Sequence, residues 1–375
     1  MAVASKTRIF LYGTLLHPPL LLAVLGREAE MTAATLPDFR VATAKDQDFP
    51  LLHEDAGHMA EGALIEVEAD GAERLDFYEG LYSYTRRTVT IGVGQDVQEA
   101  EIYWAEPDRW QVGAEWSLEV WQAKWGAITS RAATEAMAAF GVQPPADVGR
   151  RWGMIKSRAQ ADLDTQKWRR PRTIGTRIGA ETVTIDGHDY SHLGFFTFED
   201  VRLTHPRFDG GAMSVDRAVF RAGQAVTVLP YDPVHDAVLL VEQFRPAPFL
   251  QCDPDPWLLE PVAGIVDAGE SPVECAHREA LEEAGLTLQK LHFVARHYPS
   301  PGATAQQLHS YIGIADLAEV GEIGGLADEG EDIRIHVVPY QAAQDALASG
   351  EIVVAPLILS LQWLALHRDR LRGDA

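Results

Sequence analysis

The stretch from Gly264 to Leu286, GIVDAGESPVECAHREALEEAGL, limits what this chain can fold into more than any other part of it. Its second half predicts a short helix, because Ser271 suits the N-cap, Pro272 suits the first helical position, and Glu274 completes a capping box. Gly285 stands where a left-handed C-cap would end the helix. We therefore expect a loop that leads into a capped helix.

Three carboxylates share one face of this predicted helix. Glu279 precedes Glu282 and Glu283 by three and four residues, and like charges at that spacing destabilise a helix unless something offsets them. A hard divalent cation such as Mg²⁺, which prefers oxygen ligands, is one candidate. The alternative is a solvated acidic face balanced by Arg278. The helix alone leaves both interpretations open.

The spacing of the fixed positions in this stretch resembles the Nudix box, the signature of hydrolases that cut nucleoside diphosphates linked to another moiety. These positions are Gly264, Glu270, Arg278, Glu279, Glu282, Glu283, Gly285 and Leu286. The resemblance implies an α/β/α sandwich with a mixed sheet for the second half of the chain.

Four flanking segments are similar to the ADP-ribose diphosphatase branch of that family. They are Glu242–Arg245, Trp257–Gly264, Ser300–Gly302 and Gly325–Asp332. Pro301 lies close to the place where a proline marks ADP-ribose preference in that branch. The resemblance implies Mg²⁺-dependent hydrolysis of ADP-ribose to AMP and ribose 5-phosphate, with Mn²⁺ as an alternative cation.

The resemblance also implies roles for single residues. The metal ligands would be the backbone carbonyl of Ala263 and the side chains of Glu279, Glu283 and Glu331. Two further carboxylates would act in catalysis. Glu282 would face the metal cluster, and Glu329 would orient or deprotonate the attacking water. Bound cations would neutralise the diphosphate and lower the pKa of the water.

Substrate contacts are implied for Arg217, Arg245 and Ser300. An arginine fork suits phosphate oxygens, and the position matching Arg217 often reaches the nucleotide across a dimer interface, so a homodimer through this domain is expected. The alternative for Arg245 is a salt bridge with Glu242. Gln306 departs from the family, which has an acidic residue there, and this affects the contact to the terminal ribose.

Two segments near the N-terminus resemble the gamma-glutamyl cyclotransferase-like family, which implies a small domain built like a β-barrel. They are Tyr12–Leu15 and Leu75–Gly80. The resemblance implies that Glu79 is the acid/base that releases 5-oxoproline, and that Tyr12, Gly13 and Leu15 line the pocket. The alternative is that Glu79 is an exposed helix-end residue of a domain that binds without turnover.

The chain of 375 residues exceeds one typical compact core, so two domains are expected. We predict a mixed α+β protein with a first domain over 1–145, a basic helical linker over 146–178 and the Nudix-like domain over 179–375. The basic linker is either an anion-binding tail or a connector that docks against acidic surfaces. Apolar residues such as Trp152, Ile155 and Trp168 interrupt the basic run and favour the connector.

A net charge of -23 argues against binding to nucleic acid or anionic membranes through general electrostatics. The two cysteines suggest neither a disulfide framework nor a zinc site. The apolar run near the N-terminus is too short to span a bilayer, so a cytoplasmic protein is expected. The resemblance to the ADP-ribose diphosphatase branch implies a small nucleotide-sugar substrate.

Two other functions stay open at this point. One is cyclotransferase activity at Glu79, and the other is a first domain that senses a metabolite and regulates hydrolysis of another nucleotide sugar or dinucleotide. Chains that pair these modules resemble bacterial proteins associated with tellurite resistance. The two cysteines offer no thiolate pair for tellurium chemistry, so that phenotype would be indirect.

Overall fold

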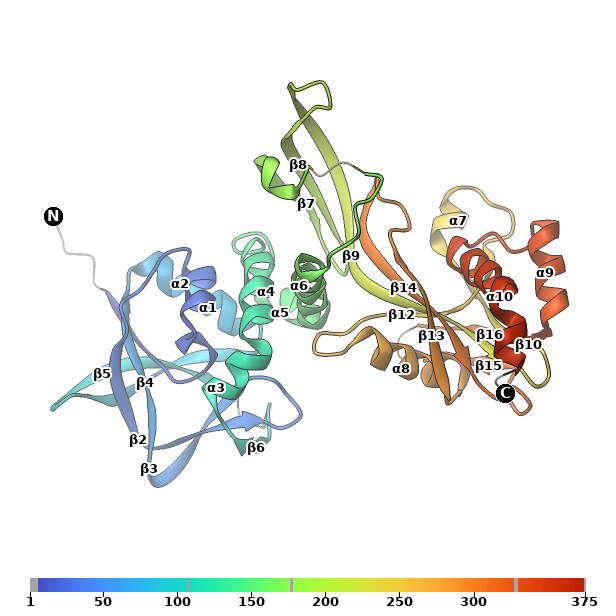
Figure 1. The fold of residues 1–375 in the computed structure, drawn as a ribbon. Helices are drawn as coiled ribbons and strands as arrows, with labels where there is room; N and C mark the ends of the chain where they lie inside the picture. The colour runs from blue at the N-terminus through green and yellow to red at the C-terminus, as the bar shows by residue number, and fades with distance from the viewer. Residues whose placement is uncertain (1–5, 107, 176–177, 327–329, 374–375) are drawn as a thin grey trace. The chain divides into compact units, whose positions relative to one another are not determined.

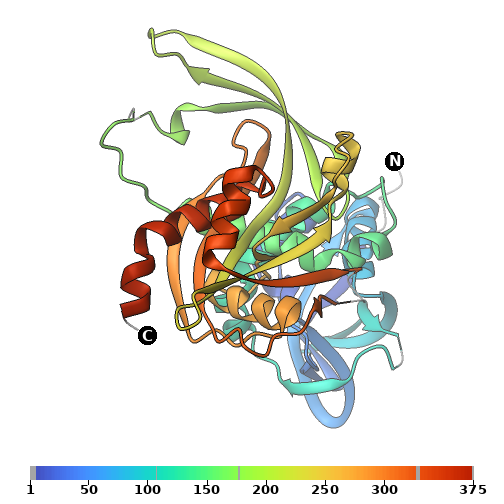
Figure 2. The ribbon, with the colours of Figure 1, turned by 90° about the vertical axis from the view of Figure 1, so that its right-hand side faces the viewer.

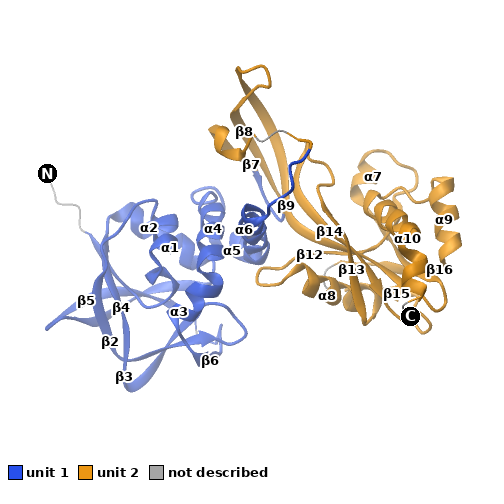
Figure 3. Ribbon diagram, viewed as in Figure 1, with its two compact units in different colours: residues 1–173, 192–195 blue, residues 174–191, 196–375 orange. Residues whose placement is uncertain are grey.

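The structure is a computed structural model that describes residues 6–106, 108–175, 178–326 and 330–373. The chain forms two compact units, shown in Figure 3. Unit 1 comprises residues 1–173 and 192–195, and unit 2 comprises residues 174–191 and 196–375. The fold is mixed α/β, as expected, with a small barrel in unit 1 and a mixed sheet covered by helices in unit 2. The domain limits at 145 and 178 stay a prediction.

Five strands of unit 1 close into a barrel, because the outer strands β2 and β3 also pair with each other. A sixth strand, β6, extends this sheet from β2. The strands are β1 (Thr7–Leu11), β2 (Thr32–Ala44), β3 (Pro50–Val67), β4 (Tyr84–Val93), β5 (Asp96–Ala105) and β6 (Val112–Glu115). Alternate side chains, such as Phe10, Leu36 and Ile102, form one core cluster.

The helices of unit 1 pack on the other set of strand side chains, which includes Ile9, Leu11 and Ile65. They are α1 (Pro18–Leu25), α2 (Ala69–Gly80), α3 (Leu118–Trp121), α4 (Ala127–Met137), α5 (Pro145–Arg150) and α6 (Trp152–Lys167), with a 3-10 turn at Thr14–Leu16 and a π-helical turn at Gln122–Gly126. The predicted basic linker is therefore helical over most of its length, and its helices belong to unit 1.

Helix α6 contains Arg158, one of the largest fully buried side chains of the chain. Arg158 forms an ion pair with Glu135 of α4 and donates to the carbonyl of Phe195 at 2.5 Å. Gln143 donates to the carbonyl of Leu193 at 2.9 Å. These bonds attach residues 192–195 to unit 1, although the residues before and after them belong to unit 2.

Unit 2 contains a ten-stranded sheet organised around β9. The N-terminal half of β9 pairs with β8, and its C-terminal half pairs in parallel with β14 and antiparallel with β12. The strands are β7 (Thr184–Leu193), β8 (Thr197–Pro206), β9 (Ala212–Asp232), β10 (Ala237–Phe244), β11 (Trp257–Glu260), β12 (Val262–Ile265), β13 (Lys290–His297), β14 (Thr304–Ile314), β15 (Ile323–Gly324) and β16 (Ile333–Pro339).

Helices cover both faces of this sheet, which gives the expected sandwich (Figures 1 and 2). On one face, α8 (Pro272–Ala284) packs on residues such as Val226 and Val241. On the other face, α9 (Tyr340–Ser349) and α10 (Ala355–Gly373) pack on residues such as Leu229 and Leu240. A short helix, α7 (Pro246–Leu250), and a 3-10 turn at Ala180–Thr182 complete the unit.

The acidic helix α8 begins and ends as predicted. Ser271 accepts a hydrogen bond from the Glu274 amide, the Glu274 side chain accepts from the Ser271 amide, and Pro272 occupies the first turn. Gly285 closes the helix in the left-handed conformation, with φ of 63°. Within the described residues every helix, α8 included, is too short or too polar to cross a bilayer.

Candidate active site

Helix α8 and strand β12 meet at Gly264, where the side chain of Glu279 lies directly against the strand backbone. A Cβ on Gly264 would fall 1.7 Å from Oε1 of Glu279, so any side chain there would displace this carboxylate. One turn further along α8, Oε2 of Glu283 accepts a hydrogen bond of 3.1 Å from the Ala263 amide. The two carboxylates are thus held on adjacent residues of β12.

Both carboxylates are buried, and the burial changes their protonation. The pKa of Glu279 is raised to about 7, chiefly by burial; Arg278 opposes this shift, and the negative charges of Glu282 and Glu331 contribute to it. Burial raises the pKa of Glu283 to about 8, and the charges of Glu279 and Glu331 add to this effect. These groups gain by sharing a cation, because a nearby positive charge favours the ionised form. The electrostatics therefore favour the metal interpretation of the helix.

Arg278 pairs with two carboxylates of α8 and with one in the loop before it. Its guanidinium lies 2.9 Å from Glu270, 2.7 Å from Glu279 and 2.9 Å from Glu282. It also donates to the carbonyl of Ile265 at 3.2 Å. One side chain thereby links the loop before the helix to two carboxylates on it.

Glu331 approaches the site from a distant segment of the chain. Its Oε2 accepts a hydrogen bond of 3.2 Å from the Leu326 amide, and its charge affects both Glu279 and Glu283. The structure thus brings together three of the predicted metal-ligating carboxylates. Glu329, the predicted catalytic base, lies outside the described residues, so its role stays a prediction.

Arg245 lies beside this site but is not paired with the residue that the sequence suggested. Its guanidinium donates to Oε2 of Glu260, with the Nε contact at 2.9 Å, and its positive charge lowers the pKa of Glu283. Glu242 instead contacts His336 at 2.8 Å. The alternative of an Arg245–Glu242 salt bridge is therefore wrong. Glu260 lies in the segment Trp257–Gly264 that the sequence analysis singled out, but no role was predicted for it.

Two predicted substrate-binding residues lie away from the buried carboxylates. Arg217 precedes Val226, the partner of Gly264, by nine residues on β9, which is about 30 Å along an extended strand. Its side chain is exposed and donates to the carbonyl of Asp216 at 2.8 Å. Ser300 is exposed in the β13–β14 turn, where its carbonyl accepts from Ala303 and Thr304. Arg217 is thus not brought to the carboxylates of its own chain.

In unit 1, Glu79 ends helix α2 with a half-buried side chain. No hydrogen bond or ion pair to its carboxylate occurs within the described residues. Burial raises the pKa of Glu79 to about 8. Burial, with a smaller contribution from the charge of Glu79, raises the pKa values of the surrounding tyrosines, which are Tyr12, Tyr78, Tyr82, Tyr84 and Tyr103. A half-buried, unpaired carboxylate among tyrosines suits proton transfer better than the role of an exposed helix end.

The predicted pocket residues of unit 1, Tyr12, Gly13 and Leu15, lie directly after strand β1. The hydroxyl of Tyr12 donates to the carbonyl of Tyr103 at 2.7 Å. Gly13 lies against Pro50, so closely that a Cβ would fall 2.3 Å from Cγ of the proline. Leu15 is buried in the core cluster. Tyr12 and Leu15 thus have structural contacts of their own, and their predicted substrate contacts stay predictions.

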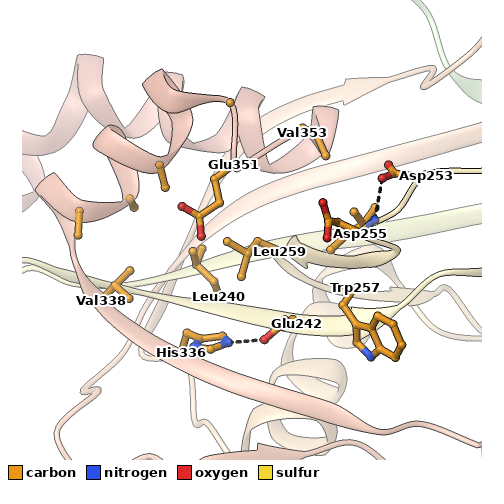
Figure 4. Close-up of a pocket in the computed structure, with 15 residues that line it drawn as sticks. Leu240, Glu242, Asp253, Asp255, Trp257, Leu259, His336, Val338, Glu351 and Val353 are labelled. Carbon is orange, nitrogen blue, oxygen red and sulfur yellow. Dashed lines mark hydrogen bonds and ion pairs between the residues drawn. The ribbon is translucent and has the colours of Figure 1, made fainter. Parts of the chain in front are cut away.

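A cavity of about 640 Å³ lies on the α9 side of the unit 2 sheet (Figure 4). Its lining includes Glu242, Asp253, Asp255, His336 and Glu351. It lies on the face opposite α8, and within the described chain none of the predicted site residues lines it. It is therefore separate from the acidic helix.

A further group of possible metal ligands comprises Asp232, His235 and Asp316. Both oxygens of Asp232 already accept hydrogen bonds, from the amides of Val234, His235 and Leu317 and from the His235 ring. These bonds close the turn between β9 and β10. These hydrogen bonds therefore explain the position of Asp232 without a bound cation.

Comparison with known proteins matches each unit to a family. The NUDIX domain family matches residues 221–358, and the family described as gamma-glutamyl cyclotransferase, AIG2-like, matches residues 9–123. A solved structure titled as an ADP compounds hydrolase aligns with a TM-score of 0.38 at 22% identity, covering 49% of this chain and 95% of its own.

Three relatives align with the second half of the chain. An ADP-ribose pyrophosphatase of Escherichia coli is 38% identical over 206 residues, which is 55% of this chain and 98% of the relative. One of Haemophilus influenzae is 36% identical over 210 residues, 55% and 97%. A GDP-mannose pyrophosphatase of Salmonella paratyphi B is 30% identical over 185 residues, 49% and 96%. The chain is therefore a member of the Nudix hydrolase family that carries an AIG2-like domain in its first unit.

Proposed function

We propose that unit 2 hydrolyses ADP-ribose to AMP and ribose 5-phosphate. The observation that carries this proposal is the pair of buried carboxylates, Glu279 and Glu283, held against Gly264 and Ala263 with raised pKa values. The names of the E. coli and H. influenzae relatives support the choice of substrate. The GDP-mannose relative makes other nucleotide sugars the nearest alternative.

The residues present fit a divalent cation. The cluster consists of hard oxygen donors, and the two raised carboxyl pKa values indicate that positive charge is favourable there. In this proposal Glu279, Glu283, Glu331 and the carbonyl of Ala263 would hold Mg²⁺, with Mn²⁺ as an alternative. When bound, such a cation neutralises the diphosphate and acidifies water.

The side chains then have separate tasks in the cleavage. The oxygen of a water molecule forms a bond to one phosphorus, the bridging phosphorus–oxygen bond breaks, and the water proton passes to a carboxylate before reaching the products. We assign the proton acceptance to Glu329 and a supporting position to Glu282, which Arg278 holds at 2.9 Å. Arg245, beside Glu283, would contact the diphosphate.

The proposed recognition of the nucleotide includes a second copy of the chain. Arg217 lies about 30 Å along β9 from the level of Gly264, so it would reach the site of a partner subunit and not its own. A homodimer through unit 2 is therefore part of the proposal. Light scattering should show a dimer, and a monomer with full activity would exclude this role for Arg217.

The central experiment measures AMP release from ADP-ribose with and without Mg²⁺, for the wild type and for Glu283→Gln. We expect the variant to lose turnover while keeping its fold. Glu351→Gln is the control, because Glu351 is an exposed carboxylate on the opposite face of the sheet. AMP release by Glu283→Gln at the wild-type rate would refute the proposal. A panel with NADH and nucleotide sugars decides the substrate.

A second candidate function belongs to unit 1, where the Glu79 carboxylate lacks a hydrogen-bond partner in the described chain and has a pKa of about 8. As a base it would accept a proton from the α-ammonium of a γ-glutamyl compound. The freed amine would then attack the γ-carbonyl, and Glu79 would return the proton to the departing nitrogen as the amide bond breaks, which releases 5-oxoproline and the free amine. The measurement is 5-oxoproline formation from γ-glutamyl peptides, which Glu79→Gln should abolish.

If unit 1 binds such a compound without turning it over, it would regulate unit 2. Adding a γ-glutamyl peptide should then change the rate of AMP release in the wild type and not in Glu79→Gln. Two independent units would show the same rate with and without the peptide.

A further inference from the structure

Two adjacent strands in the middle of the unit 2 sheet carry polar side chains where an apolar run is expected. Strands β9 and β14 are parallel, and a parallel pair covered on both faces usually reads as a continuous hydrophobic run. The buried exceptions are Gln224, Thr227, Gln307, His309 and Ser310. Burying polar groups is costly unless they find partners, so each of them needs an explanation.

Alternation along the strands assigns these residues to two faces. Thr227 and Ser310 form a hydrogen bond of 2.7 Å, and they alternate with residues that face α8. Gln224 shares the α8 face with Val226, and Gln307 and His309 share it with Tyr311. This second set therefore lies on the same side of the sheet as Glu279 and Glu283.

The second set lies at the level of the candidate active site. His309 pairs with Val226, and Val226 pairs with Gly264, the residue under Glu279. Two strand spacings separate His309 from Gly264, which is about 10 Å. On its other side His309 pairs with Arg296 of β13. A group attached to a diphosphate at the carboxylates would extend over this distance.

Two residues of this second set, Gln224 and Gln307, have hydrogen-bond partners for their side chains. Oε1 of Gln307 accepts from Arg296 Nε at 2.9 Å and from Gln224 at 3.4 Å, and its amide donates to the Tyr298 hydroxyl at 2.6 Å. The exception is His309, which is only 8% exposed and whose Nε2 has no hydrogen-bond partner in the described chain. Burial, with Arg296 and His297 nearby, lowers the pKa of His309 to about 4, so its ring is neutral at pH 7.

We propose that Gln224, Arg296, Gln307 and His309, here called the polar row, receive the terminal sugar of a nucleoside diphosphate sugar, with Nε2 of His309 hydrogen-bonding a sugar hydroxyl. The inference rests on the proposed hydrolysis and specifies the substrate of that site. The polar row contains no carboxylate, and Gln306, which begins this part of β14, is also neutral. A neutral imidazole offers a sugar hydroxyl one donor and one acceptor.

The test compares ADP-ribose with ADP, which lacks the terminal sugar, and measures each variant against the wild type for the same ligand. Binding is measured by calorimetry with Ca²⁺ in place of Mg²⁺, and KM and kcat for ADP-ribose are measured with Mg²⁺. In His309→Ala we expect ADP-ribose to bind about tenfold more weakly, as for one lost hydrogen bond, with ADP unchanged. In the same variant, KM for ADP-ribose should rise by a larger factor than kcat falls.

Two further variants separate hydrogen bonding from packing. His309→Gln places an amide nitrogen near the position of Nε2 and should restore part of the affinity, whereas His309→Asn places it near Nδ1 and should not. Ser310→Ala is the matched control, because it removes a buried hydroxyl from the neighbouring residue on the opposite face. It should leave both affinities unchanged. The comparison of Gln with Asn holds even if His309→Ala fails to fold.

Any of three results would overturn the polar row as a sugar site. His309→Ala loses the same affinity for ADP as for ADP-ribose, His309→Ala loses no affinity, or the wild type binds both ligands equally. Failure of the proposed hydrolysis is distinguishable. A wild type that binds ADP-ribose more tightly than ADP through His309, but releases no AMP, would keep the sugar site and refute the reaction.

Discussion

The carboxylate of Glu279 occupies the space above Gly264, where a Cβ would fall 1.7 Å from Oε1. Gly264 thus lies directly against a carboxylate of the candidate metal site, and its lack of a side chain leaves room for that carboxylate. Since the strand backbone cannot move away without breaking its pairing with Val226 and Thr227 of β9, any side chain at this position must displace Glu279.

Gly264→Ala is therefore expected to lower AMP release roughly a hundredfold, the scale of a misplacement of about 1 Å in an active site. Gly321→Ala is the control, because a Cβ there meets only one backbone atom, at 3.9 Å. Steady-state kinetics at saturating Mg²⁺ check this. An alanine variant that keeps wild-type kcat would show that Glu279 is free to act elsewhere.

Arg278 connects Glu270, Glu279 and Glu282. Its removal leaves their charges without a common partner. Arg278→Ala should reduce activity or metal affinity roughly tenfold to a hundredfold, the usual effect of losing a group that orients metal ligands. Arg278→Lys keeps the charge but not the planar fork, so it should recover only part of the loss. A titration of activity with Mg²⁺ measures both, with the exposed Arg370→Ala as control.

Asp236 stabilises unit 2 by pairing with the last helix. It accepts from Arg368 Nε at 2.7 Å, from the Tyr231 hydroxyl at 2.9 Å and lies 2.9 Å from Arg372. Chiefly through Arg368, these contacts lower the pKa of Asp236 to about 2. The stabilisation is therefore full above the ordinary pKa near 4 and is lost as the pH falls toward 2.

Asp236→Asn should accordingly lower the free energy of unfolding at pH 7 by about 2 kcal/mol, and by less at pH 3. Urea denaturation at the two pH values measures the difference. Glu319→Gln is the control, because Glu319 is an exposed carboxylate of the same unit that lies outside this ion-pair network. A pH-independent difference between wild type and Asp236→Asn would argue against the ion pair.

Glu79 should make unit 1 less stable at high pH. Burial raises its pKa to about 8, so the folded state holds the proton more tightly than the unfolded state. The stability contribution of the protonated form is present below the ordinary pKa and is lost as the pH rises through 8. Glu79→Gln, which stays neutral, should thus melt at a higher temperature than the wild type at pH 9 and at a similar temperature at pH 5.

Thermal unfolding followed by circular dichroism at pH 5 and pH 9 tests this prediction. Glu73→Gln, an exposed position on the same helix, should show no such dependence on pH. The prediction fails if Glu79→Gln shifts the melting temperature equally at both pH values.

Sequence reasoning succeeded where the interactions are local. The capping box, the glycine stop and the shared face of Glu279, Glu282 and Glu283 all depend on residues within one helix, so their spacing in the chain is their spacing in space. The alternative of a salt bridge between Arg245 and Glu242 was wrong, while the predicted substrate contact of Arg245 stays a prediction. Residues three apart on a strand point to opposite faces, and Arg245 instead meets Glu260 from the neighbouring strand.

The sequence by itself therefore determined the candidate groups and their local arrangement: an acidic helix with hard-oxygen donors, and Glu79 next to Tyr78. The tertiary structure alone decided which distant residues lie near these groups. The pairing of β14 with β9 and of β9 with β12 brings His309 to the level of Gly264, although 45 residues separate them in the chain (309 − 264). Strand register sets such neighbours, and register results from the packing of the whole sheet.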